Sequence, residues 1–261
     1  MNPPPRSPRF VGNRRPRATR LKDRLDAGAL KGTFQELGTP AVTELLGLAG
    51  ADFVVIDGEH GTFSIDRLED YVRAGSSSGT AVLYRAASSS DQLARALDTG
   101  IAGIVVPRVE SGAQAHAVVD AVRFPPVGSR GLGPGRTSGY GVALDELRTS
   151  GNDEVLVVAM VETKAGLGAV DEIAQTPGID AIMIGPADLA SSLNVDSGSP
   201  ELAEAIERIR DVTLAAGIHA SIHCADAGDI ERRAHEGYRL LPASIDAAML
   251  FTAAAPLFFQ R

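Results

Sequence analysis

Two carboxylates, Glu162 and Asp188, follow two apolar segments of the chain and are spaced so that they could bind a cation together. Residues 155–162 read VLVVAMVE, and residues 180–189 read DAIMIGPADL. A short apolar run without alternation predicts a strand buried on both faces, and the residues between the two runs suffice for one crossover helix. Such a unit makes its strands parallel, so we expect both carboxylates at the same edge of the sheet.

Two neighbouring carboxylates repel each other unless a positive charge lies between them. One interpretation is a divalent cation held by both acids, with water and substrate oxygens as its other ligands, as Mg²⁺ prefers. The other interpretation is two separate acids that cap helices or face water. The pair alone leaves both interpretations open.

A histidine and an arginine follow two further apolar segments. His60 stands in the segment DGEH after a predicted strand at residues 52–57, and Arg85 ends the segment TAVLYR. A histidine can act as a general acid or base near neutral pH, and an arginine can bind a carboxylate or stabilise an enolate. The alternatives are a histidine bonded to a loop carbonyl and an arginine in a salt bridge.

These segments belong to a regular alternation of strands and helices that starts at Leu21. Eight such repeats over roughly 230 residues predict a (β/α)₈ barrel, with a doubly wound open sheet as the alternative. A glycine-rich insertion is expected from Pro125 to about Ser150. Since barrel enzymes carry their chemistry at the C-terminal ends of strands, the positions to consider are Glu36, Asp57 to His60, Arg85, Pro107, Arg108, Glu162, Asp188, His223 and Ser244.

The composition bounds the classes of protein that the chain can represent. The net charge of −8 argues against general nucleic-acid binding and suits a cytoplasmic enzyme. A single cysteine, Cys224, excludes an internal disulfide and a cysteine-rich zinc site, and no apolar run is long enough for a membrane span. Residues 1–20 are rich in proline and arginine and predict a disordered extension without a secretory signal, so residues 21–261 are expected to form one domain.

Six motifs occur in the order expected for one known family. They are VVIDGEHG, LYR, LDTGIAGIVVPRV, RFPPVGSRGLG, MVE and PGIDAIMIGPADLA. The chain resembles the HpcH/HpaI aldolase family of metal-dependent (class II) pyruvate aldolases over about residues 25–255. The resemblance implies Glu162 and Asp188 as the metal ligands, and a turn at Gly185, Pro186 and Ala187 whose backbone amides receive the pyruvate carboxylate.

The resemblance also implies four catalytic side chains. His60 falls on the family's catalytic histidine, and Arg85 on the arginine that contacts the keto oxygen and the enolate. Asp57 and Asp98 match acids near the histidine, which Asp98 is expected to orient. The implied reaction is the reversible cleavage of a 4-hydroxy-2-keto acid to pyruvate and an aldehyde, through a pyruvate enolate stabilised by Mg²⁺, Mn²⁺ or Co²⁺.

Other features leave the aldehyde and the assembly to be determined. Met160 replaces a glutamine of some members, and the ends of strands seven and eight, residues 223–224 and 242–244, give no clear match. Arg136 and Tyr140 are candidates for contacts with the far end of the substrate or with another subunit. The apolar final helix, residues 244–259, predicts a homo-oligomer, and the resemblance implies a dimer that exchanges this helix within a hexamer.

Three rival functions remain at this stage. An oxaloacetate decarboxylase, or an enzyme resembling macrophomate synthase, would use the same enolate without an aldehyde product. A Schiff-base aldolase would need a lysine at a strand end, for which Lys164 is the candidate. A barrel without activity would serve only for binding, but it has no need for the complete set of His60, Arg85, Glu162 and Asp188.

Overall fold

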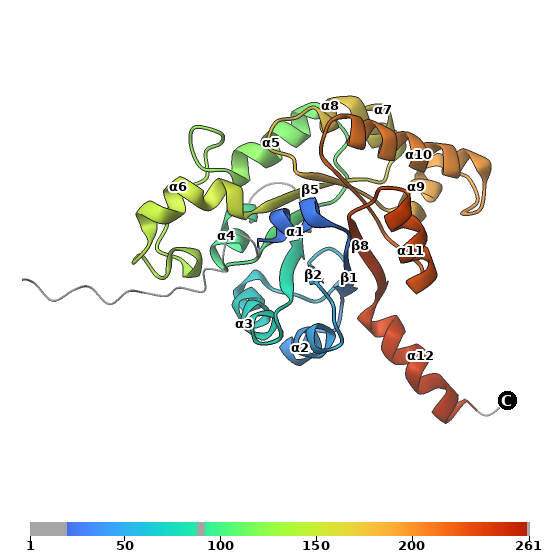
Figure 1. Cartoon of the computed structure of the whole chain (residues 1–261), viewed down its shortest axis with the longest axis horizontal. Helices are drawn as coiled ribbons and strands as arrows, with labels where there is room; N and C mark the ends of the chain where they lie inside the picture. Colours follow the sequence, from blue (N-terminus) through green and yellow to red (C-terminus); the bar gives the residue numbers. More distant parts are fainter. Residues whose placement is uncertain (1–19, 88–91, 260–261) are drawn as a thin grey trace, which may run out of the picture.

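The computed structural model describes residues 20–87 and 92–259, and within these ranges eight parallel strands close into a barrel (Figure 1). Each strand pairs with the next along the chain, and Leu30 of the first strand pairs with Leu240 of the last. The prediction of a closed (β/α)₈ barrel is therefore confirmed. The strands are β1 (Leu30–Gln35), β2 (Phe53–Asp57), β3 (Ala81–Arg85), β4 (Gly103–Val106), β5 (Leu156–Val161), β6 (Ala181–Ile184), β7 (His219–Ile222) and β8 (Leu240–Ile245).

In β2 to β6 and in β8, alternate residues of each strand belong to two different apolar clusters. One cluster joins outward-facing strand residues to the surrounding helices, whereas the other consists of strand residues such as Phe53, Val55 and Met160 together with two residues of the first helix. The second cluster fills the barrel, because side chains on one face of a strand recur every two residues. The same alternation directs Asp57 and Glu162, two residues beyond Val55 and Met160, to the interior at the C-terminal mouth.

The helices surround the barrel, and the first one closes its N-terminal end. They are α1 (Leu21–Ala27), α2 (Pro40–Leu48), α3 (Leu68–Ser78), α4 (Leu93–Asp98), α5 (Gly112–Val122), α6 (Leu144–Glu154), α7 (Lys164–Gly168), α8 (Val170–Ala174), α9 (Pro186–Leu193), α10 (Pro200–Ala215), α11 (Ala227–His235) and α12 (Asp246–Phe258), with the short 3₁₀ helices η2 (Ile65–Arg67) and η3 (Arg136–Ser138). Of the predicted extension, residues 1–19 lie outside the described residues, and Arg20 pairs with Glu154 at 3.3 Å.

Four helices correct the predicted pattern. The crossover between β5 and β6 is two short helices, α7 and α8, and not one. The predicted insertion contains helix α6, because Leu147 and Gly151, one turn apart, are buried and Leu147 packs beside Phe124. Helix α9 begins at Pro186, so Asp188 lies in the first turn of a helix and not at the end of a strand.

The last helix, α12, projects away from the barrel (Figure 1). Its apolar side chains are largely exposed, including Leu250, Phe251, Leu257 and Phe258, and Asp246 is its one buried residue in the described part of the chain. An exposed apolar face of this kind on a single chain indicates a surface for contact with another protein. A search of the described helices finds none of sufficient length and hydropathy to cross a membrane.

Candidate active site

Glu162 is a deeply buried acid at the C-terminal mouth of the barrel. It follows β5, is 3% exposed, and accepts a hydrogen bond at Oε1 from the backbone N–H of Arg108 at 2.9 Å. Arg108 has a φ of +53°, a conformation that non-glycine residues adopt rarely, and it thereby turns its amide toward the carboxylate. The end of β4 thus holds the side chain at the end of β5.

The electrostatic surroundings of Glu162 favour a cation. Burial raises the pKa of Glu162 to about 7, and the negative charges of Asp188 and Glu59 act in the same direction, against the Arg108 amide. A carboxylate in this position is stabilised by a positive charge placed between it and its acidic neighbours. Asp188, on the first turn of α9, is exposed and open to such an ion.

The donor set fits a hard divalent ion. Within residues 20–87 and 92–259, no group of three or more His, Cys, Asp or Glu side chains is arranged to hold a metal. The two carboxylates Glu162 and Asp188 would therefore be joined by water or substrate oxygens. Mg²⁺ and similar ions accept this arrangement, since they retain several waters when one or two carboxylates bind them.

Arg85, at the end of β3, is fixed by two acids and one aromatic ring. Its Nε and Nη2 donate to the two carboxylate oxygens of Asp57 at 2.8 and 2.5 Å, and Nη1 lies 3.3 Å from Glu59. The guanidinium carbon lies 4.8 Å from the centre of the Phe34 ring. Burial alone would lower the pKa of Arg85, but the hydrogen bonds to Asp57 outweigh this effect and raise it. Burial alone would raise the pKa of Asp57, but the hydrogen bonds from Arg85 outweigh this effect and lower it.

Asp57 has no free oxygen for proton transfer in this arrangement. Besides the fork of Arg85, its Oδ1 accepts the backbone N–H groups of Glu59 at 3.0 Å and His60 at 3.2 Å. Asp57 therefore organises the turn that carries His60 and orients Arg85. The His60 side chain is 61% exposed, and its Nε2 lies 3.9 Å from Glu59.

Asp98 has a different partner from the one predicted. It ends α4 and accepts a hydrogen bond from Arg130 at 2.7 Å, whose guanidinium also stacks on Phe124. No hydrogen bond connects Asp98 with His60 in the described parts of the chain. The orientation of His60 by Asp98 stays a prediction, while the observed contact ties the glycine-rich segment to α4.

Gly185 separates Glu162 from the start of α9. A Cβ atom at residue 185 would lie 2.8 Å from Oε2 of Glu162, so only glycine leaves the carboxylate in place. Pro186 follows at the first helical position, which needs no N–H donor. The amides of Ala187 and Asp188 lie in the first turn, where backbone N–H groups have no partner within the helix.

The wall of the mouth built by β7, β8 and β1 presents the uncharged side chains of Phe34, His223 and Ser244, and we call it the neutral wall. Its buried acid, Asp246, accepts the backbone N–H groups of Glu36 and Leu37 at 2.8 and 3.0 Å. His223 stacks against Phe34 with ring centroids 5.9 Å apart, and its Nε2 lies 3.3 Å from the carbonyl of Ser244. Ser244 has a φ of +58°. Sequence reasoning placed His223 and Ser244 at the mouth but missed Phe34, although the alternation of β1 turns its side chain inward.

No role was predicted for Glu59, although it lies within the segment from Asp57 to His60 that was placed at the mouth. Its carboxylate joins Arg85 and His60. Its position in the segment from Asp57 to His60 was the available signal. Arg136 and Tyr140, predicted to contact either the far end of the substrate or another subunit, bond the Thr99 carbonyl and Glu69, and both alternatives stay predictions.

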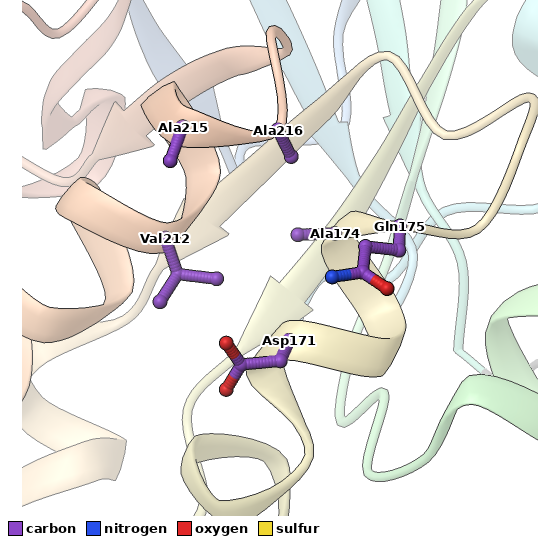
Figure 2. Close-up of a pocket in the computed structure, with 6 residues that line it drawn as sticks. All are labelled: Asp171, Ala174, Gln175, Val212, Ala215 and Ala216. Atoms are coloured by element: carbon purple, nitrogen blue, oxygen red, sulfur yellow. The ribbon is translucent and has the colours of Figure 1, made fainter.

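A surface pocket of about 270 Å³ lies away from the barrel mouth, between α8 and α10 (Figure 2). Its lining residues are Asp171, Ala174, Gln175, Val212, Ala215 and Ala216. One acid and one amide among small apolar side chains do not form a catalytic set. The mouth residues, and not this pocket, constitute the candidate active site.

Comparison with known proteins shows the family to which the chain belongs. The HpcH/HpaI aldolase/citrate lyase family pattern matches residues 31–253. The chain belongs to this family. A hydroxypyruvate/pyruvate aldolase of Delftia acidovorans is 33% identical over 87% of this chain and 86% of its own length.

Two further members extend the comparison. A 2-keto-3-deoxy-L-rhamnonate aldolase of Klebsiella pneumoniae is 33% identical over 82% of this chain and 81% of its own. A family protein of Burkholderia cenocepacia, with a crystal structure, is 31% identical and superposes with a TM-score of 0.85, covering 91% of this chain and 96% of its own. These proteins share the fold and nearly the full length of the domain.

Proposed function

We propose that the protein is a class II aldolase that reversibly cleaves a 4-hydroxy-2-keto acid to pyruvate and an aldehyde. The proposal rests on one observation: the same barrel mouth holds the buried Glu162, whose surroundings favour a cation, and the guanidinium of Arg85, which Asp57 fixes in place. An enolate develops negative charge, and a fixed positive group beside it stabilises that charge. The relatives named as aldolases support the same reaction class.

Glu162 and Asp188 are the proposed ligands of a divalent cation, with Mg²⁺, Mn²⁺ and Co²⁺ as candidates. When bound, the ion would supply Lewis acidity toward the 2-keto acid and a template for its orientation. Gly185 keeps the space beside Glu162 open. The Arg108 amide holds the carboxylate in the orientation required before the ion arrives.

Arg85 is proposed to stabilise the negative charge that forms on the keto oxygen. Asp57 contributes indirectly, because its two oxygens fix the guanidinium plane and anchor the turn before His60. Asp57 is a positioning residue in this scheme. The turn at Gly185, Pro186 and Ala187, at the positive end of α9, is proposed to receive the substrate carboxylate through its backbone amides, although Pro186 itself has no N–H to donate.

His60 is proposed to act as the general acid and base of the reaction. In cleavage, a base removes the proton of the 4-hydroxyl group, the C4–O bond becomes the carbonyl of the aldehyde, and the C3–C4 electron pair passes to the enolate. Protonation at C3 then gives pyruvate. The exposed His60 ring can exchange protons with water, and the Glu59 carboxylate lies 3.9 Å from its Nε2.

The assembly is proposed to be a dimer that exchanges α12, within a hexamer. The projecting helix with its exposed Leu250, Phe251 and Phe258 supports an intersubunit contact. Light scattering at micromolar concentration tests the assembly, and a monomer would contradict it. The predicted cytoplasmic location stays a prediction.

The function is tested by pyruvate release from a panel of 4-hydroxy-2-keto acids, with EDTA and with Mg²⁺, Mn²⁺ or Co²⁺ restored. We expect activity that EDTA abolishes and a divalent ion restores. Release of CO₂ from oxaloacetate without aldehyde formation from any panel member would indicate a decarboxylase instead. A borohydride-trapped adduct on Lys164 would overturn the metal-dependent mechanism.

A further inference from the structure

The neutral wall of the mouth places one titratable ring, that of His223, next to the strand that leads to Asp188, because the backbone N–H of His223 donates to the carbonyl of Ile184 at 3.3 Å. On β7, Ser221 pairs with Met183 of β6 and Leu240 of β8, which both belong to the apolar cluster inside the barrel. His223 comes two residues later, and the alternation of the strand directs it to the same interior side. The Phe34 ring lies between this histidine and Arg85, contacting both.

The His223 ring has a defined orientation. Its Nε2 lies 3.3 Å from the carbonyl oxygen of Ser244, which also accepts a hydrogen bond from Thr33 Oγ1 at 3.2 Å. A carbonyl oxygen only accepts, so Nε2 carries the proton in this contact and Nδ1 of the neutral ring carries a lone pair. Ser244 presents its carbonyl from a backbone with φ of +58°, which fixes the direction of the contact.

The surroundings keep this ring neutral and leave it hydrogen-bonding capacity. Burial lowers the pKa of His223, and the charge of Arg85 adds to the decrease, against the Ser244 contact. In the part of the chain that the structure describes, Ser244 is the hydrogen-bond partner of the ring. Ser221, one step deeper on the same face, is fully buried, and its Oγ has no hydrogen-bond partner among the described residues.

The two parts of a bound 2-keto acid would face different walls of the mouth. In the proposed function, the ion that Glu162 and Asp188 would hold, together with Arg85, would bind the carboxylate and keto oxygens of the substrate, which lie on one side of the breaking C3–C4 bond. The substituents beyond C4 extend toward the remaining wall, where His223 and Ser221 are the polar groups with unused capacity. A hydroxyl group is the substituent that a neutral imidazole nitrogen with a lone pair can bind.

We infer that His223 is a specificity-determining residue that accepts a hydrogen bond at Nδ1 from a hydroxyl group of the aldehyde half. The substrates are then hydroxyaldehyde adducts of pyruvate, and alkyl aldehydes of the same size react less well. This inference rests on the proposed aldolase function. It assigns no role to His223 in forming the enolate.

The test separates the two halves of the reaction in the full-length protein with its divalent ion. Deuterium exchange at C3 of pyruvate in D₂O requires only the enolate half, and NMR spectroscopy measures it. Addition of pyruvate to glycolaldehyde or to propanal requires both halves, and these acceptors differ by a hydroxyl in place of a methyl group. The quantity compared is the ratio of kcat/KM for the two acceptors.

Two variants separate the contributions of the two nitrogen atoms of the His223 ring. His223→Gln keeps a donor near the Nε2 position and removes the Nδ1 acceptor, whereas His223→Asn keeps an acceptor near Nδ1. His219→Gln is the matched control, because His219 begins the same strand at the opposite end of the barrel and pairs with Asp26 at 3.1 Å. We expect wild type, the control and His223→Asn to favour glycolaldehyde, and His223→Gln to lose roughly 10-fold of that ratio, as one hydrogen bond implies.

Each other outcome contradicts a separate statement. An unchanged acceptor ratio in His223→Gln, with pyruvate exchange intact, would overturn the role of His223 and leave the aldolase proposal standing. Loss of exchange in a folded His223→Gln protein would move the residue to the enolate half and overturn the assignment. Absence of exchange in wild type with every divalent ion would refute the proposed function itself.

Discussion

The two walls of the barrel mouth hold their side chains by different means. On the wall of β2, β3 and β5, charged groups fix one another: Arg85 is forked onto Asp57, and Glu162 is bonded to a strained backbone amide. On the wall of β7, β8 and β1, a neutral ring is held by an aromatic contact and a single carbonyl. A charged wall accepts few substitutions, because a lost partner leaves a buried charge, whereas a neutral wall can change its side chains without that cost.

Removal of the buried charge on the first wall is expected to have the largest effect. Glu162→Gln keeps the shape and the Arg108 contact but removes half of the charge that attracts the cation. We expect kcat/KM for pyruvate formation to fall on the order of 1000-fold, with weaker divalent-ion binding by calorimetry. Asp171→Asn, an acid removed on α8, is the control. Near-normal activity of Glu162→Gln would mean that the charged wall tolerates substitution as well as the neutral wall does.

The same residue makes the metal-free protein sensitive to pH. Because burial raises the pKa of Glu162 to about 7 from an unfolded value of 4.5, its favourable contribution is complete below pH 4.5 and is lost as the pH rises through 7. In EDTA at pH 8, we expect the free energy of unfolding of Glu162→Gln to be about 3 kcal/mol larger than that of wild type. Urea titrations at pH 5 and pH 8 measure the difference, which should shrink at the lower pH. Equal stabilities at pH 8 would contradict the raised pKa.

Arg85→Lys tests the fork and not merely the charge. A lysine keeps one positive charge but cannot donate to both oxygens of Asp57 while facing the keto oxygen. We expect a loss of about 100-fold in kcat with a smaller change in KM, since the missing contact acts mainly on the developing enolate. Arg95→Lys, at an exposed ion pair with Asp66, is the control. A normal kcat would show that charge alone suffices.

The smallest effect is expected on the neutral wall. Ser244→Gly relieves a left-handed backbone that costs serine about 1 kcal/mol, while glycine loses more freedom on folding, so we expect a stability gain below about 1 kcal/mol. Asn194→Gly, with a φ of +56° at the end of α9, should gain less, because asparagine tolerates this conformation. Thermal unfolding compares the two variants. A large loss of stability in Ser244→Gly would indicate that the wall depends on the serine hydroxyl.

The order of the elements was predictable because each buried strand is a short apolar run followed by a polar residue. Asp57, Arg85 and Glu162 were located in this way, since the end of such a strand in a barrel is its mouth. Asp188 was misplaced by the same reasoning, because the apolar residues of β6 continue into α9. The dipeptide Gly185–Pro186 was the overlooked signal, as proline favours the first position of a helix.

The contacts between distant strands were not predictable from residue types. Asp57 was expected to work beside the histidine, yet its oxygens are occupied by Arg85 and backbone amides. The alternation of β1 turns Phe34 inward, but its place beside His223 depends on the pairing of β1 with β8, which no local pattern specifies. Burial, which sets the pKa of Glu162, likewise depends on the whole barrel and not on its own segment.

Closure of β1 on β8 has a consequence for the order in which the mouth assembles during folding. The contact of Asp57 with Arg85 spans 28 residues, whereas that of Thr33 with Ser244 spans 211. Since contacts between distant residues form slowly, the charged wall can assemble from neighbouring strands while the neutral wall waits for the two ends of the chain to meet. Stacking of His223 on Phe34 is thus a reporter of the last folding step.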